Sequence, residues 1–420
     1  GHGGLKALGQ HNRHAVPGLY ALGMEDMAQT VGRVLQLRKG PAAPQALPRH
    51  MLTDGDLIGG LGLGSPAATA SLRHVEVDRD FPAKALVQGD VVVAHRVLPA
   101  TAWSVLFLYH RCSMYQVLRE STSTFVSLRG CRYHLLRWGS PSAQQPPLVL
   151  AHGWMDVGAS WQFMVDALSD AFVQDRPIVA FDWRGYGQTE SPTTDSYWFP
   201  DYLGDLDALL DIVSPGQPID LVGHSMGGNV VMMYAGVRPE RIRKLVNLEG
   251  FGMASTRPAQ APGRLGQWLD ELRQHREGAI DLKAYPDAAA VASRLMKTNP
   301  RLPQGKAEWL ARHWAKPDTD GQWRILGDAA HKIINPYLYK VDDAQEIFKR
   351  ISAPVLAVEA SDDSLGQWWK GKYTLEEYHQ RLQAVPKHRI ARIEDAGHML
   401  HHDQPQALAQ LLQNFLDTND

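Results

Sequence analysis

The chain has 420 residues, of which 44% are hydrophobic and 21% charged, and its formal net charge is -2. These values are typical of a globular protein with a substantial core, and the near-neutral charge argues against a nucleic-acid-binding protein. The 2 cysteines, Cys112 and Cys131, are too few for a disulfide framework, so we expect a reducing, cytoplasmic environment.

The most apolar stretch, "ATAWSVLFLY" (100–109), is too short for a transmembrane helix and has polar neighbours. The first residues lack the long apolar segment of a secretory signal, so we expect neither secretion nor membrane insertion. The chain does not begin with methionine, which is consistent with a fragment or a processed product.

Residues 1–113 contain no repeat and no recognisable motif. The sequence predicts a helix within 18–39, a flexible loop at 55–68 and a strand within 86–98. We interpret this region as an extension of unknown role, either weakly ordered or a small accessory element. An interaction module for another protein is the alternative. Met114 is a plausible start for the part with clear patterns.

From about residue 120 the pattern becomes regular. The segments 124–130 and 131–139 predict a β-hairpin. Short apolar runs separated by longer helical stretches follow it, at 147–153, 177–185, 219–225, 244–250, 354–361 and 388–398. Because β-rich runs alternating with helices are typical of parallel sheets, the sequence predicts an α/β fold with a mostly parallel sheet and helices on both faces.

The segment 251–351 separates two of these strands and is far longer than an ordinary connection. Within it, 263–274, 288–297 and 305–315 have the periodicity of amphipathic helices. We therefore expect a core of residues 114–250 and 352–420 that carries an inserted helical cap at 251–351.

Ser225 lies in "IDLVGHSMGGNV" (219–230), between a predicted strand and a predicted helix. A serine there occupies a sharp turn, in which Gly223 and Gly227 leave room for the backbone and Gly228 allows the helix to pack closely. The turn exposes the hydroxyl at the carboxyl edge of the sheet, and the helix N-terminus offers the Met226 N–H to an anion. The pattern predicts that Ser225 is a nucleophile, with a structural turn without chemistry as the alternative.

His398 is the expected general base, because it follows the last strand and Gly397 frees the backbone before it. His401 and His402 are its rivals. They form a pattern with Asp403 that resembles a metal cluster, but adjacent histidines at a helix start point apart, so we expect no metal site.

The third catalytic residue should be a carboxylate that orients the imidazole. Asp363 follows the strand 354–361 and gives the chain order Ser, Asp, His, so it is our first choice. Glu249, at the end of the preceding strand, is the alternative, and its other interpretation is a cap for the following turn. Asp362 is the third candidate.

A second oxyanion donor is expected at the strand end "LVLAHGWMD" (148–156). Gly153 permits a tight turn that directs the Trp154 N–H to the site. The loop 181–192, which contains Arg184, is interpreted as structural, and it lacks the spacing of a nucleotide-binding loop. The segment 251–351 is also rich in tryptophan, which predicts either an apolar substrate pocket or a cap core; these residues are Trp268, Trp309, Trp314 and Trp323.

Together, "HGW", "DWRGYGQT", "GHSMGG", "PVLAVEASDD" and "GHMLHHDQP" resemble the α/β-hydrolase superfamily over residues 120–418. The insert and the "NLEG" and "SDDS" segments are similar to its serine-hydrolase-like, capped esterase branch. The resemblance implies an eight-stranded, mostly parallel sheet, a lid over the site and no cofactor. Dehalogenases and epoxide hydrolases of this fold carry an aspartate nucleophile, so Ser225 argues against both.

Ala360 stands where the family usually has glycine, and "NLEG" is similar to the segment that supplies the acid in dehalogenases. We expect a serine hydrolase that cleaves a small or medium apolar carboxylic ester through an acyl-enzyme. A C–C bond hydrolase and a cofactor-free perhydrolase use the same machinery and are alternatives. A catalytically silent ligand-binding protein is the alternative from another class.

Overall fold

The computed structural model describes residues 114–140 and 144–418, together with four strands that precede them. Those strands are β1 (Arg73–Glu76), β2 (Ala83–Gln88), β3 (Val91–Arg96) and β4 (Val105–His110). The chain divides after Tyr109 into two units, which are described separately.

The first unit contains a sheet with the order β1-β2-β3-β4, in which β1 pairs antiparallel with β2 and β2 with β3. The strand predicted within 86–98 is confirmed as β3, with the end of β2 before it. The sequence did not predict β1 and β4. The predicted helix at 18–39 and the predicted loop at 55–68 lie outside the described residues.

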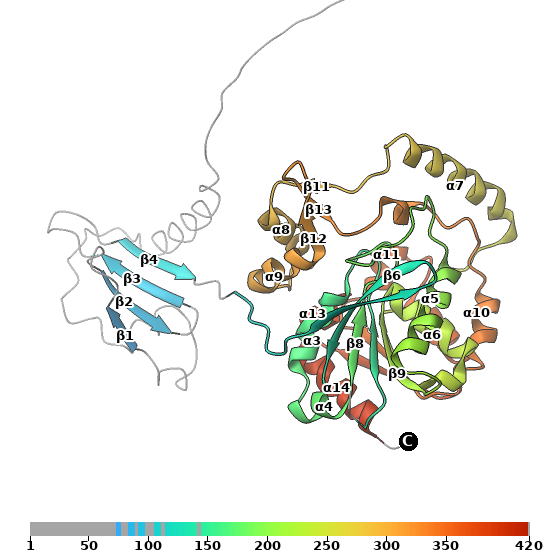
Figure 1. Cartoon of the computed structure of the whole chain (residues 1–420), viewed down its shortest axis with the longest axis horizontal. Helices are drawn as coiled ribbons and strands as arrows, with labels where there is room; N and C mark the ends of the chain where they lie inside the picture. The colour runs from blue at the N-terminus through green and yellow to red at the C-terminus, as the bar shows by residue number, and fades with distance from the viewer. Residues whose placement is uncertain are drawn as a thin grey trace, which may run out of the picture. The chain divides into compact units, whose positions relative to one another are not determined.

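The second unit is built on the expected eight-stranded sheet, whose order is β15-β14-β10-β9-β7-β8-β6-β5 (Figure 1). The hairpin is confirmed as β5 (Thr122–Leu128) and β6 (Cys131–Trp138), and β6 joins β8 antiparallel. The other pairs are parallel. Their strands are β7 (Leu148–Ala151), β8 (Ile178–Phe181), β9 (Ile219–His224), β10 (Ile242–Leu248), β14 (Val355–Ala360) and β15 (His388–Ile393).

The parallel strands bury both faces, so alternate residues enter different cores. On β7, Leu148 and Leu150 join one hydrophobic cluster, whereas Val149 and Ala151 join the other. Period-2 alternation within a continuous apolar run is what a sheet covered on both faces requires. Helices cover each face (Figure 1). The first face carries α3 (Gln162–Ala167) and α14 (Pro405–Asp417), and the second carries α5 (Phe199–Val213), α6 (Met226–Val237) and α12 (Leu375–Leu382).

The segment between β10 and β14 contains the three predicted helices and a fourth. They are α7 (Ala261–Arg276), α8 (Ala288–Thr298), α9 (Gln304–Trp314) and α10 (Val341–Phe348). The segment also contains a small antiparallel sheet, which the sequence did not predict because strands of two or three residues have no readable period. Its strands are β11 (Ala284–Tyr285), β12 (Ala315–Pro317) and β13 (Trp323–Ile325).

This segment, residues 251–351, is called the insert below. Its helices α8 and α9 contribute Val291 and Leu310 to the same hydrophobic cluster as the sheet residue Leu150. In contrast, Leu272 is the one buried residue of α7. Within the part of the chain that the structure describes, no helix is both long enough and apolar enough to cross a membrane.

Two helix glycines provide a matched test of how the insert packs on α6. A Cβ atom at Gly236 of α6 would lie 2.2 Å from the carbonyl oxygen of Ile347 in α10, whereas one at Gly266 of α7 meets nothing within 4 Å. We expect Gly236→Ala to lower the free energy of unfolding because α10 must move. Gly266→Ala should raise it by about 0.5–1 kcal/mol through helix propensity.

Chemical denaturation of both variants, monitored by circular dichroism, measures these changes. If Gly236→Ala were as stable as Gly266→Ala, the close packing of α10 on α6 would be contradicted.

Candidate active site

Ser225 occupies a strained turn between β9 and α6. Its φ is 54° and its ψ is -115°, a combination that non-glycine residues adopt rarely and mostly at functional sites. A Cβ atom at Gly223 would lie 2.5 Å from the Gly227 carbonyl oxygen, and one at Gly227 would lie 2.5 Å from the carbonyl oxygens of Ala151 and His152. The turn therefore requires glycine at both positions.

Gly228 is equally restricted, because a Cβ atom there would lie 2.3 Å from Asn247 Oδ1. The Ser225 N–H donates to the Leu248 carbonyl oxygen at 2.8 Å, which ties the turn to the end of β10. Met226 is the first residue of α6, so its N–H has no partner within the helix and is available to an anion.

The turn after β7 lies directly against Ser225. A Cβ atom at Gly153 would be 3.1 Å from Ser225 Cβ and 2.9 Å from His224 Nδ1, so a larger residue would push the turn away from Ser225. His152 stabilises the turn: its Nδ1 donates to the Gly153 carbonyl oxygen at 2.7 Å, and its Nε2 accepts from the Trp183 N–H at 3.0 Å. Burial lowers the pKa of His152 to about 4, which keeps this ring neutral.

Two contacts from the insert hold the same turn. Trp314 Nε1 donates to the Met155 carbonyl oxygen at 3.0 Å, and Trp154 Nε1 donates to the His331 carbonyl oxygen at 3.3 Å. Met155 itself has a φ of 53°, so the turn is strained next to Trp154. These roles of Trp314 and His331 could not be predicted from the sequence, since both depend on contacts between residues more than 150 positions apart.

His398 and Glu249 form an ion pair at the carboxyl edge of the sheet. His398 Nδ1 lies 3.2 Å from Glu249 Oε2, and the Glu249 side chain is 1% exposed whereas that of His398 is 21% exposed. Glu249 Oε1 accepts from the Ala360 N–H at 2.8 Å, and Oε2 also accepts from the Ser364 hydroxyl. These donors fix the carboxylate, and its contact to Nδ1 leaves Nε2 as the ring atom available for proton transfer.

Burial disfavours the charged form of both partners. It lowers the pKa of His398 to about 3. It raises the pKa of Glu249 to about 7, although the hydrogen bonds from Ser364 and Ala360 oppose this shift. The ring is therefore neutral and able to accept a proton, and Glu249 changes its charge near neutral pH.

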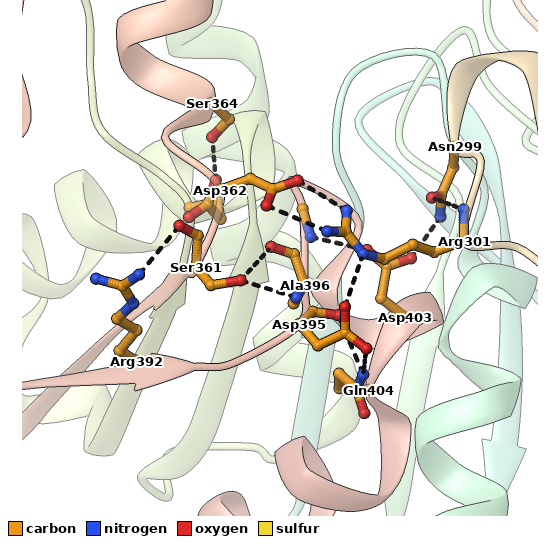
Figure 2. Close-up of polar contacts among 12 residues, drawn as sticks. Asn299, Arg301, Ser361, Asp362, Ser364, Arg392, Asp395, Ala396, Asp403 and Gln404 are labelled. Atoms are coloured by element: carbon orange, nitrogen blue, oxygen red, sulfur yellow. Dashed lines mark hydrogen bonds and ion pairs between the residues drawn. The ribbon is translucent and has the colours of Figure 1, made fainter.

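The structure places Asp363, our first choice for the acid, in another role. Its carboxylate caps α11 (Ser364–Trp369) by accepting from the Gly366 N–H at 2.7 Å. Asp362, the third candidate, forms an ion pair with Arg301 at 2.7 Å (Figure 2). Of the three candidate carboxylates, Glu249 is the one that contacts His398.

Arg301 belongs to the insert and connects it with the loop that carries His398 (Figure 2). Besides Asp362, it contacts Asp395 at 3.4 Å. Asn299, two residues earlier, donates to Asp403 at 2.6 Å, and Asp403 in turn accepts from the Gly397 N–H at 2.9 Å. The backbone that directly precedes His398 is thus held by contacts from the insert and from Asp403.

The two rival histidines are in α13 (Leu400–Asp403) and are buried, with exposed fractions of 1% for His401 and 3% for His402. The His401 ring lies 4.9 Å from that of Trp161, and the His402 ring lies 5.3 Å from that of Phe163. Neither histidine has an ion pair with Glu249 among the described residues.

The tryptophans of the insert pack against hydrophobic clusters, as expected for a cap core. They are Trp309, Trp314 and Trp323 against the cluster that includes α8 and α9, and Trp268 against a small cluster around Leu272. A tryptophan outside the insert lies beside His398. Trp368 of α11 is 52% exposed, and its ring lies 4.2 Å from that of His398 with an edge-to-face orientation.

Residues 146–405 match the family model described as alpha/beta hydrolase fold, which covers more than half of the chain. The chain belongs to the α/β-hydrolase family.

Within this hydrolase, the loop 181–192 is structural, as expected: Asp182 accepts from the Gly158 and Gln188 N–H groups, both at 2.7 Å, and Arg184 pairs with Asp205.

Individual relatives support the resemblance to the serine-hydrolase-like branch. The serine hydrolase-like protein of Danio rerio is 26% identical over 284 residues, which cover 66% of this chain and 83% of that protein. The cis-3-alkyl-4-alkyloxetan-2-one decarboxylase of Shewanella oneidensis is 24% identical over 298 residues, or 70% of this chain and 87% of that protein. A solved thioesterase domain from the curacin biosynthetic pathway is 26% identical with a TM-score of 0.59, and the match covers 70% of this hydrolase and 99% of that domain.

The Arg301 contacts predict that the insert orders the His398 loop. In Arg301→Gln, the ion pairs with Asp362 and Asp395 are lost, so amide hydrogen exchange at 395–398 should accelerate. The free energy of unfolding should fall by no more than about 1 kcal/mol, because the pairs are partly exposed.

Arg324→Gln is the matched control, since Arg324 also pairs with two carboxylates, those of Asp318 and Asp320, within the insert. Hydrogen exchange followed by mass spectrometry measures both variants. Equal exchange at 395–398 in the two variants would show that Arg301 does not order this loop.

Proposed function

We propose that this hydrolase cleaves carboxylic esters through an acyl-enzyme on Ser225, with His398 as the base and Glu249 as the acid. The observation that carries the proposal is the 3.2 Å contact between His398 Nδ1 and the buried Glu249 carboxylate, at the same sheet edge as the strained Ser225 turn. Relative to the expectation from sequence, Glu249 takes precedence over Asp363, whose carboxylate caps α11.

In this mechanism, Ser225 Oγ attacks the carbonyl carbon of the ester while His398 Nε2 takes the hydroxyl proton. The negative charge on the carbonyl oxygen is stabilised by the N–H groups of Trp154 and Met226. Glu249 stabilises the imidazolium that forms. His398 then gives the proton to the departing alcohol, and the acyl group stays on Ser225.

A water molecule completes the cycle. It transfers a proton to His398 Nε2 and attacks the acyl carbon, and the bond to Ser225 Oγ breaks as His398 returns the proton. The serine is regenerated and the carboxylic acid leaves. Among the described residues, Ser225 Oγ has no hydrogen bond with His398, which is common in active sites before substrate binds.

The surroundings of the base support a small or medium apolar ester as the substrate. Trp154, in the turn next to Ser225, and Trp368, beside His398, are each 52% exposed, so the region near the site presents apolar surface to a ligand.

The first test is hydrolysis of short-chain and medium-chain p-nitrophenyl esters. Wild type should turn them over, and Ser225→Ala of equal folded content should lose about 10⁶-fold in kcat, which is below detection. If neither protein hydrolyses any ester of the series, the proposed substrate class is wrong.

The second test separates the two carboxylates. Glu249→Gln should reduce kcat about 10⁴-fold, because the imidazolium loses its counter-charge. Asp363→Asn should stay within about tenfold of wild type, since its effect is limited to a helix cap. The opposite order of the two variants would assign the acid to Asp363.

The pH dependence of kcat/KM provides a third test. Acidification protonates Glu249, whose pKa is raised to about 7, whereas His398 stays neutral because its pKa is lowered to about 3. The rate should therefore rise with pH through about 7 and then level off. Asp363→Asn should keep the shape of this profile but move it to slightly lower pH, because the charge of Asp363 contributes to the raised pKa of Glu249. A constant rate between about pH 6 and 8 would contradict the assigned role of Glu249.

A further inference from the structure

Three buried side chains converge near the turn after β7, and the proposed mechanism uses none of them. They are Asp156, His224 at the end of β9 and His401 in α13, and one potential ligand atom from each lies within 4.8 Å of the other two. Their exposed fractions are 5% for Asp156 and 1% for each histidine. Two imidazoles and a carboxylate are a ligand set suited to divalent transition metals such as Zn²⁺ and Co²⁺.

Each of the three residues has a polar atom without a hydrogen-bond partner among the described residues. These atoms are Asp156 Oδ2, His224 Nδ1 and His401 Nδ1. Leaving a buried polar atom unpaired is unfavourable, so three such atoms on converging side chains favour an occupant that contacts these side chains. His401 Nε2 lies 3.9 Å from Asp156 Oδ2, which is too long for a hydrogen bond between them.

In His224 and Asp156 the other polar atom of the side chain is hydrogen-bonded, as is usual for metal ligands. His224 Nε2 donates to the His398 carbonyl oxygen at 2.8 Å, which fixes the tautomer and leaves a lone pair on Nδ1. Asp156 Oδ1 accepts from the Ser160 hydroxyl, so Oδ2 is the free atom. The Trp161 ring packs on His401 with the centroids 4.9 Å apart.

The three side chains are somewhat farther apart than the ligands of a bound ion. Ligand atoms of a tetrahedral zinc ion are about 3.4 Å apart, so from separations within 4.8 Å the side chains would close by at most about 1.4 Å around it.

We propose that Asp156, His224 and His401 bind one divalent transition-metal ion, and that this ion inhibits the hydrolase. The inhibitory part rests on the proposed function. His224 directly precedes Ser225, and its ring holds the His398 backbone and lies against Gly153. Closure of the three ligands around an ion moves this ring and therefore disturbs the base and the oxyanion turn together.

Equilibrium dialysis of the full chain against Zn²⁺, followed by metal analysis, tests the site without any activity measurement. Wild type should bind one ion per chain at this site. Asp156→Asn and His401→Gln should each weaken its binding at least about tenfold, because each removes a ligand. The matched control is His402→Gln: His402 is adjacent, equally buried and has an unpaired Nε2, but it is outside the group of three.

Several outcomes would overturn the site. One is a wild-type protein that binds no ion. Another is binding that all three variants retain, or that His402→Gln loses as well. Circular dichroism and the melting temperature establish that each variant is folded. Asp156→Asn preserves the side-chain shape and decides the question if His401→Gln does not fold.

Ester hydrolysis in the presence of Zn²⁺ tests the inhibitory effect. Wild type and His402→Gln should be inhibited at the concentration that fills the site, and Asp156→Asn should require at least about tenfold more metal. Inhibition that is equal in Asp156→Asn and wild type would place the effect elsewhere and overturn the coupling. If the protein hydrolyses no ester, the proposed function fails, while the dialysis result still decides the metal site.

Discussion

The arrangement of the site depends on the sharp turn at Ser225. With a φ of 54°, the residue can be accommodated only because the glycines around it allow three backbones to approach one another. The Ser225 N–H donates to the carbonyl oxygen of Leu248, which is the last residue of β10 and directly precedes Glu249. The position of Ser225 is thus connected through one backbone hydrogen bond to the strand that precedes the proposed acid.

Glu249 is itself constrained in the same way. Its φ is 55°, its N–H donates to the Val358 carbonyl oxygen at 3.1 Å, and its carboxylate accepts from Ala360 and Ser364. The hydrogen-bond partners of its backbone and of its side chain all come from β14 and the segment after it. Parallel strands that end at one edge therefore hold Ser225 and the Glu249 carboxylate in a fixed relation. The segment that carries His398 is held by contacts from the insert, which are those of Arg301 with Asp395 and of Asn299 with Asp403.

Local patterns in the sequence were sufficient to predict the parallel sheet, from its apolar runs, and the helices α7 to α9, from their amphipathic periodicity. They were also sufficient to predict the candidates Ser225 and His398, because each follows a strand and a glycine-containing turn. Local patterns were not sufficient to predict which carboxylate contacts the His398 ring. Glu249 and Asp363 both follow strands that end at the same edge, so their spacing cannot show which one turns toward the ring. The helix that begins directly after Asp363 was a readable sign of a cap. The contact between Arg301 and Asp362 joins distant segments and leaves no local pattern.

The most direct test of the central claim is the covalent reaction of the full chain with a fluorophosphonate, followed by intact-mass and peptide mass spectrometry. This measurement does not require the substrate to be known. The account predicts a single adduct on Ser225, formed rapidly in wild type, slowly in Glu249→Gln and not at all in Ser225→Ala. A folded wild-type protein without an adduct, or with its adduct on another residue, would contradict the assignment of Ser225 as an activated nucleophile.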